Sequence, residues 1–172
     1  MGHMMRKLFR PGVGERHQNL TVAFVNGTLY GGDVCVWDTT APTSQAYNGA
    51  TDTLGSNDFI YVTTSSTAYG LAAGITLAGG GSEMDSVTAI TDDNIAVIQT
   101  WGVCINCQTV DDTVAAGAGL ILDATAGQLG DAALGTDTID GSVVGVALTA
   151  DYTFTRAAAT VYGVTGFVRC NG

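Results

Sequence analysis

The sequence predicts an all-β protein: a single compact barrel or sandwich of about ten short strands, preceded by an extended N-terminal arm. Three observations favour this class. Short β-branched and aromatic runs recur at intervals of about 8–12 residues, bounded by Gly, Asn, Asp and Ser. Glycine contributes 24 of the 172 residues, and charged residues are only 13% of the chain. The mixture of Ala, Glu, Lys, Leu and Arg that is typical of long helices is missing.

Most of the strand candidates lie before residue 108. Residues 20–25 (LTVAFV) run into Asn26-Gly27, a strong tight-turn dipeptide. Residues 94–103 are mostly apolar, which indicates one long strand or two strands joined by a bend at Gly102, and residues 103–107 continue it. The other candidates are 33–38, 59–64, 74–78 and a short one at 86–91.

The second half repeats this rhythm with longer intervals. Residues 119–123 (GLILD) form a strand candidate that is closed by the small residues ATAG. Residues 128–142 are small and acidic, and we expect a long surface loop there. Further strands are expected at 143–148 and 159–170. Only 68–73 and 113–118 could carry a helical turn, and a glycine weakens each of them.

Charge divides the chain into two predicted parts. Residues 1–16 contain Arg6, Lys7, Arg10 and Arg16 against one acid, a net charge of +3. Residues 17–172 contain two arginines against 15 acids, a net charge of −13. We therefore expect a basic, flexible arm at 1–18 and an all-β domain at 19–172. The start of the arm, residues 1–4, resembles an expression leader.

The same balance limits the possible partners. A net charge of −10 does not suit a protein that binds nucleic acid, because phosphate contacts need clustered Lys and Arg. No apolar run is long enough to cross a membrane, and no signal peptide follows the basic N-terminus. We expect synthesis in a cytoplasm, where the four cysteines stay reduced.

The sequence contains little evidence of a metal site or of catalytic residues. Cys104 and Cys107 form a C-x-x-C, but zinc sites usually add a second pair or spaced histidines, and positions i and i+3 of a strand face opposite sides. The histidines lie in the arm, and Glu83 is a lone loop glutamate. The aspartate pairs do not match a calcium-binding loop. We expect no metal, no cofactor and no enzymatic activity, and a hydrolase that uses Glu83 is the least favoured alternative.

Aromatic residues and unprotected edges indicate protein contacts. Trp37 and Trp101 lie within apolar strand candidates, where they are expected to anchor a core or an interface, as is Phe167 near the C-terminus. Soluble monomers often protect sheet edges with lysine, yet the only lysine is Lys7 in the arm. This composition favours an oligomer or a component of an assembly.

The C-terminal third resembles a known family. Residues 119–127 read GLILDATAG, residues 144–150 read VGVALTA, and residues 163–169 read GVTGFVR, while residues 32–38 resemble an earlier copy of the first motif. This order is similar to that of the capsid decoration, or cement, proteins of tailed bacteriophages, which have a β-tulip-like barrel.

The resemblance implies a virion structural protein. Such a protein would bind the outside of the major capsid protein lattice as a homotrimer and stabilise the head, and its location would be the outer surface of the capsid. Arg6, Lys7, Arg10 and Arg16 would then contact an acidic capsid surface or a neighbouring trimer. The alternative is a receptor- or carbohydrate-binding β module of a viral tail or fibre, with Trp37, Tyr47 or Tyr69 as an exposed platform.

Overall fold

The fold is all-β, as the sequence predicts. The structure is a computed structural model that describes residues 19–38, 44–47, 52–55, 61–64, 72–79, 88–110, 113–132 and 143–170. The predicted arm at 1–18 lies outside these residues. The strands are β1 (Asn19–Val25), β2 (Val34–Trp37), β3 (Ser44–Tyr47), β4 (Asp52–Gly55), β5 (Tyr61–Thr63), β6 (Ala72–Gly79), β7 (Ile95–Thr109), β8 (Gly119–Leu122), β9 (Leu129–Asp131), β10 (Val143–Ala147), β11 (Tyr152–Arg156) and β12 (Ala159–Arg169).

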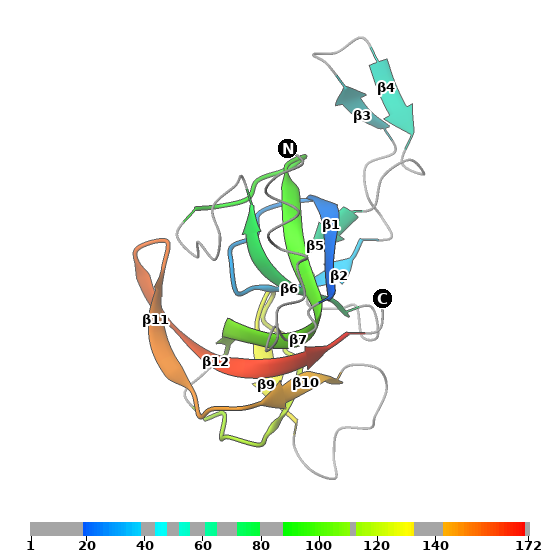
Figure 1. Cartoon of the computed structure of the whole chain (residues 1–172). Helices are drawn as coiled ribbons and strands as arrows, with labels where there is room; N and C mark the ends of the chain where they lie inside the picture. Colours follow the sequence, from blue (N-terminus) through cyan, green and yellow to red (C-terminus); the bar gives the residue numbers. More distant parts are fainter. Residues whose placement is uncertain are drawn as a thin grey trace, which may run out of the picture.

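Ten of these strands form one sheet that closes on itself twice. The strand order is β1-β5-β2-β6-β7-β9-β8-β10-β12-β11, and β7 pairs additionally with β1 and with β12. The first closure makes a five-stranded ring of β1, β5, β2, β6 and β7, which we call barrel one. The second makes a ring of β7, β9, β8, β10 and β12, which we call barrel two. The long strand β7 is the wall that both barrels share (Figure 1).

Strand β7 serves both barrels because its buried side chains change cluster along its length. Ala96 and Ile98 belong to the core of barrel one, whereas Cys104 and Cys107 belong to the core of barrel two. A single strand with one buried face would show strict alternation with polar residues. In the shared strand even the polar Gln99, Gln108 and Thr109 are buried, which explains why the sequence shows no regular alternation of apolar and polar residues.

Strands β2 and β6 are buried on both sides for the same reason. Cys35 and Ala73 point into the core of barrel one. Their neighbours Val34, Val36 and Ala72 belong instead to the cluster that fills barrel two. The two barrels therefore pack against each other through these strands, and the ten-stranded sheet forms one body with two connected cores.

Four local predictions are corrected by the structure. The loop expected at 128–142 contains β9, whose residues pair with β8 and, at Leu129, with β7. The short strand expected at 86–91 is reduced, within the described residues, to one bridge between Leu29 and Ile90. Residues 113–118 form an irregular turn, not a helical one. Strand β11 was not expected at all, although it makes a five-pair antiparallel ladder with β12.

The β11–β12 connection is a tight turn with an unfavourable sequence. Both central residues have positive φ, 46° at Ala157 and 67° at Ala158. This is the backbone of a type I′ turn, which strongly prefers Asn-Gly. The left-handed region costs an ordinary L-residue about 1–2 kcal/mol.

We expect the double variant Ala157→Asn/Ala158→Gly to be more stable than the natural chain by about 1–2 kcal/mol. The reason is that Asn and Gly occupy this turn with less strain than two alanines. Urea unfolding would measure the difference. An unchanged or lower midpoint would show that the turn is not strained.

Candidate functional site

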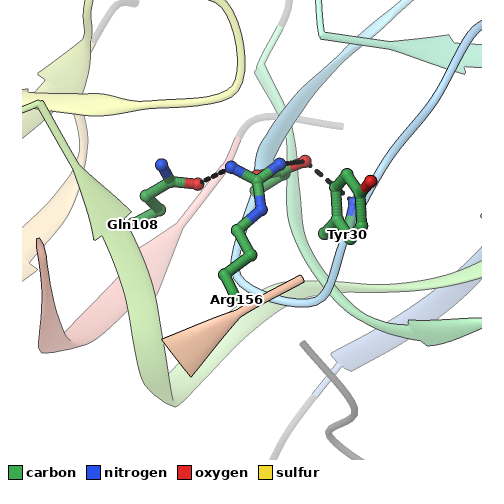
Figure 2. A network of polar contacts seen from close by, with 4 residues as sticks. Tyr30, Gln108 and Arg156 are labelled. Atoms are coloured by element: carbon green, nitrogen blue, oxygen red, sulfur yellow. Dashed lines mark hydrogen bonds and ion pairs between the residues drawn. The ribbon is translucent and has the colours of Figure 1, made fainter. Parts of the chain in front are cut away.

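A buried ion pair joins the N-terminal and C-terminal parts of the chain. Asp33 lies directly before β2 and is fully buried, while Arg156 ends β11. The Arg156 Nη2 atom donates to Asp33 Oδ2 at 2.7 Å, and Nη1 donates to Gln108 Oε1 on β7. The guanidinium carbon lies 4.4 Å from the centroid of the Tyr30 ring, within cation–π range (Figure 2). This network ties the tip of the β11–β12 hairpin to barrel one.

The surroundings of Asp33 hold its carboxylate in place and change its acidity. The backbone N–H of Tyr30 donates to Asp33 Oδ2 at 2.9 Å. Burial raises the pKa of Asp33 to about 6, and the Arg156 charge and the Tyr30 hydrogen bond oppose this increase. Asp33 Oδ1 and Arg156 Nε are buried without a hydrogen-bond partner among the described residues. The carboxylate is therefore enclosed, and the geometry indicates a structural role: the ion pair holds the β11–β12 hairpin against barrel one.

A second polar contact holds the other end of β11. The Tyr152 hydroxyl accepts from the backbone N–H of Asn106 at 2.9 Å and donates to Asn106 Oδ1 at 3.0 Å. Asn106 has a positive φ of 55° inside β7. It therefore marks an irregular position in the strand, and the tyrosine satisfies the amide that this position turns away from the ladder.

We expect Tyr152→Phe to lower the free energy of unfolding by about 1–3 kcal/mol, because the Asn106 amide loses its acceptor. Chemical denaturation would measure the loss. Tyr162→Phe is the matched control, since Tyr162 is exposed on β12, and it should change stability by less than about 0.5 kcal/mol. Equal effects at both positions would contradict the role of Tyr152.

The cysteines occupy the cores. Cys104 and Cys107 are both buried in barrel two, because the irregular backbone at Asn106 brings positions i and i+3 to the same side. This corrects the expectation that they face opposite sides. A hydrogen bond with Cys107 and burial raise the pKa of the Cys104 thiol, and burial raises that of Cys35 to about 12. High pKa values make both thiols weak nucleophiles. Among the described residues, no three Cys, His, Asp or Glu side chains gather into a metal-binding group.

An apolar row crosses the outer wall of barrel two. Phe167 on β12 pairs in register with Val103 on β7 and with Val146 on β10, so the three side chains share one face. The Trp101 ring meets the Phe167 ring edge-on, with centroids 5.2 Å apart. Val146 is 43% exposed. We call Trp101, Val103, Val146 and Phe167 the outer row; the exposed Arg169, which pairs with Trp101, stands at its end.

Comparisons with known proteins give little support for any family. No family model and no curated protein matches the chain. Among solved structures, the search found the N base of the head fibre protein gp8.5 of bacteriophage phi29, with 12% identity and a TM-score of 0.42. The match covers 91% of this chain and 100% of that chain. Similarity at this level does not establish a common fold.

The structure places the three predicted anchors in two locations. Trp37 ends β2 and packs, half-buried, against the core of barrel one, so its ring is not an exposed platform. Trp101 and Phe167, distant in the sequence, meet in the outer row. The arm residues Arg6, Lys7, Arg10 and Arg16 lie outside the described residues, as do Glu83 and both histidines.

The Asp33–Arg156 pair was missed by the sequence analysis. A signal for Asp33 existed, since a buried charge in an apolar strand requires a partner. Its partner is 123 residues away, and no local spacing could have identified it. Within the described ranges, the structure contains no helix with the length and hydropathy that a bilayer crossing requires.

Proposed function

We propose that this chain is a non-catalytic virion structural protein that decorates the head of a tailed bacteriophage as a homotrimer. The observation that carries the proposal is the outer row. Trp101 and Phe167 form an aromatic pair on a sheet face, beside the exposed Val146. Aromatic residues in a partly exposed apolar patch are typical of protein–protein contacts.

The family motifs support the same role, because they fall on neighbouring strands. GLILDATAG covers β8 and the turn after it, VGVALTA covers most of β10, and GVTGFVR covers the end of β12. These three strands are consecutive in barrel two, in the order β8-β10-β12. The resemblance to decoration proteins therefore concerns one continuous wall of the molecule, and that wall carries part of the outer row.

The basic arm is proposed to contact the major capsid protein. Arg6, Lys7, Arg10 and Arg16 give it the opposite sign to the acidic domain. A trimer would present three arms to the shell at once, so that several weak contacts add through avidity. Cationic contacts to an exposed surface weaken as salt screens them.

Binding to undecorated heads tests this function. Purified protein should sediment with such heads and reach saturation, and a chain that lacks residues 1–18 should bind at least tenfold more weakly, with less salt dependence. Loss of saturable binding by the full chain contradicts head decoration, and binding to glycans in its place would favour the tail or fibre module. Equal binding by both chains at every salt concentration removes the arm from the contact.

A further inference from the structure

Strands β2 and β5 are joined by far more chain than their geometry needs. They are antiparallel neighbours, with Val36 opposite Thr63 and Trp37 opposite Val62. Just beyond them, the Asp38 N–H donates to the Tyr61 carbonyl at 2.9 Å. A two-residue turn could close such a hairpin. Residues 39–60 stand between them instead, which is far longer than an ordinary hairpin loop of about 2–5 residues.

This insertion contains a small sheet of its own. Strands β3 and β4 pair with each other, from Ser44 opposite Gly55 to Tyr47 opposite Asp52. They form a separate two-stranded sheet and join no strand of the ten-stranded sheet. A two-stranded hairpin is marginal in water unless it packs on another surface. The β3–β4 hairpin therefore needs a surface that its own ladder does not supply.

The outer row is an apolar surface that could receive the hairpin, but within one chain it lies far from the hairpin. Figure 1 shows the β3–β4 hairpin at the end of the molecule opposite to β10 and β12, which carry Val146 and Phe167 of the outer row. Val146 is 43% exposed, so the chain's own hairpin does not cover it. The hairpin and the outer row lie at opposite ends of one chain, so they can contact each other only if they come from two different copies.

Charge favours this contact between two otherwise acidic copies. The insertion contains two aspartates, Asp52 and Asp58, and no cation. The other outer wall, on barrel one, ends at Asp92 and Asp93, which would repel it. The outer row has no acid among its four members, and the exposed Arg169 stands at its end. Among the described residues the other arginine, Arg156, is turned inward toward Asp33.

We propose that the β3–β4 hairpin of one copy packs on the outer row of the next copy, so that the insertion is the arm that assembles the oligomer. The inference rests on the proposed homotrimer and names its contact. Donor and acceptor are different surfaces, so the contact is heterologous, and a heterologous contact that closes makes a ring. Three such contacts would complete a trimer.

The first test removes the donor. Replacing residues 39–60 by Asn-Gly joins Asp38 to Tyr61, which are already hydrogen-bonded, and should preserve both barrels. Sedimentation equilibrium should give a trimer for the full chain and a monomer for this deletion variant. Thr53→Pro in the full chain places a proline inside the β3–β4 ladder, opposite Ala46, and should weaken the trimer at least tenfold, even if the deletion variant does not fold.

The second test removes the acceptor and then combines the two defects. Val146→Lys adds a charge to the outer row at an exposed position and should also give a monomer. Val22→Lys is the matched control, because Val22 is also exposed but lies on the outer wall of barrel one, and this variant should remain a trimer. A mixture of the deletion variant and Val146→Lys has one intact hairpin and one intact row, so it should form a one-to-one dimer and nothing larger.

The outcomes distinguish the proposed hairpin contact from the proposed head decoration. A deletion variant that remains trimeric overturns the hairpin contact and leaves head decoration standing. Two monomeric variants that do not pair when mixed overturn the contact between hairpin and row. A full chain that is monomeric overturns the contact and the trimer together, while binding to undecorated heads is measured separately and still decides whether the protein is a decoration protein.

Discussion

Gly145→Ala is expected to destabilise the protein by about 4 kcal/mol or more, a large part of the total stability of a domain. Gly145 lies in β10, where it pairs with Val168 on β12. A Cβ at this position would collide with the carbonyl oxygen of Phe167, and it would also lie 3.2 Å from the Val168 Cα. These atoms belong to the backbone of the barrel wall, so they cannot move aside by rotation as the end of a flexible side chain would.

Thermal or urea unfolding would measure this loss. Val22→Ala is the control, because it shortens an exposed side chain on the outer wall of barrel one, away from the outer row, and should change stability by no more than about 0.5 kcal/mol. If Gly145→Ala were as stable as the natural chain, the close approach of β10 and β12 would be wrong. The result would then also question the register that places Val146 beside Phe167.

The second large effect is expected at Asp33. Asp33→Ala should lower stability by about 3–5 kcal/mol at neutral pH, because it leaves the guanidinium of Arg156 largely buried without its counter-ion. Asp33→Asn should cost less, since the amide oxygen can still accept from Arg156 and from the Tyr30 N–H. Asp131→Asn is a control for the loss of an exposed charge and should be close to neutral.

The same residue predicts a pH dependence with a definite sign. Burial raises the pKa of Asp33 from 3.8 to about 6 in the folded protein, so the folded state binds a proton more tightly than the unfolded state. The stability that this group contributes is therefore complete below pH 3.8 and is lost as pH rises through about 6. At about 1.4 kcal/mol per pKa unit, the difference amounts to about 3 kcal/mol.

The measurement is the free energy of unfolding of the natural chain minus that of Asp33→Asn, from pH 4 to pH 8. This difference should fall between pH 4 and pH 6 and then level off. The subtraction removes the titration of the exposed aspartates, which both proteins share. A difference that rises with pH would mean that the Arg156 charge outweighs burial and that the pKa of Asp33 is lowered.

The sequence predicts the fold class well because the strand signals are local. β1, β2 and β8 coincide with runs of β-branched and apolar residues that end at turn-forming residues. β11 escaped prediction although Tyr152, Phe154 and Arg156 alternate with threonine. Its turn is Ala157-Ala158, and alanine gives no turn signal. β9 has only three residues, and its existence depends on partners that are remote in the sequence.

The candidate sites were predicted only in part, for a related reason. Single-residue properties identified Trp101 and Phe167 as anchors, because large aromatic residues in apolar strands usually bury against something. That the two meet follows from the register of β7 against β12, which the sequence does not encode locally. The barrel closures, the second buried face of β2 and the salt bridge of Asp33 have the same origin in long-range pairing.

The shared strand β7 makes the molecule indivisible. A cut on either side of residues 95–109 deprives one barrel of the strand that closes it, and no fragment of the chain can keep β7 for both. The half that keeps β7 retains the five strands of its barrel, but Val34, Val36 and Ala72 of β2 and β6 pack in the core of barrel two, so the cut also divides that core. Neither half is therefore expected to persist as an independent module. Mechanical load on one wall must pass through the same fifteen residues into the other, so the two barrels are expected to resist force, and to fail, as one.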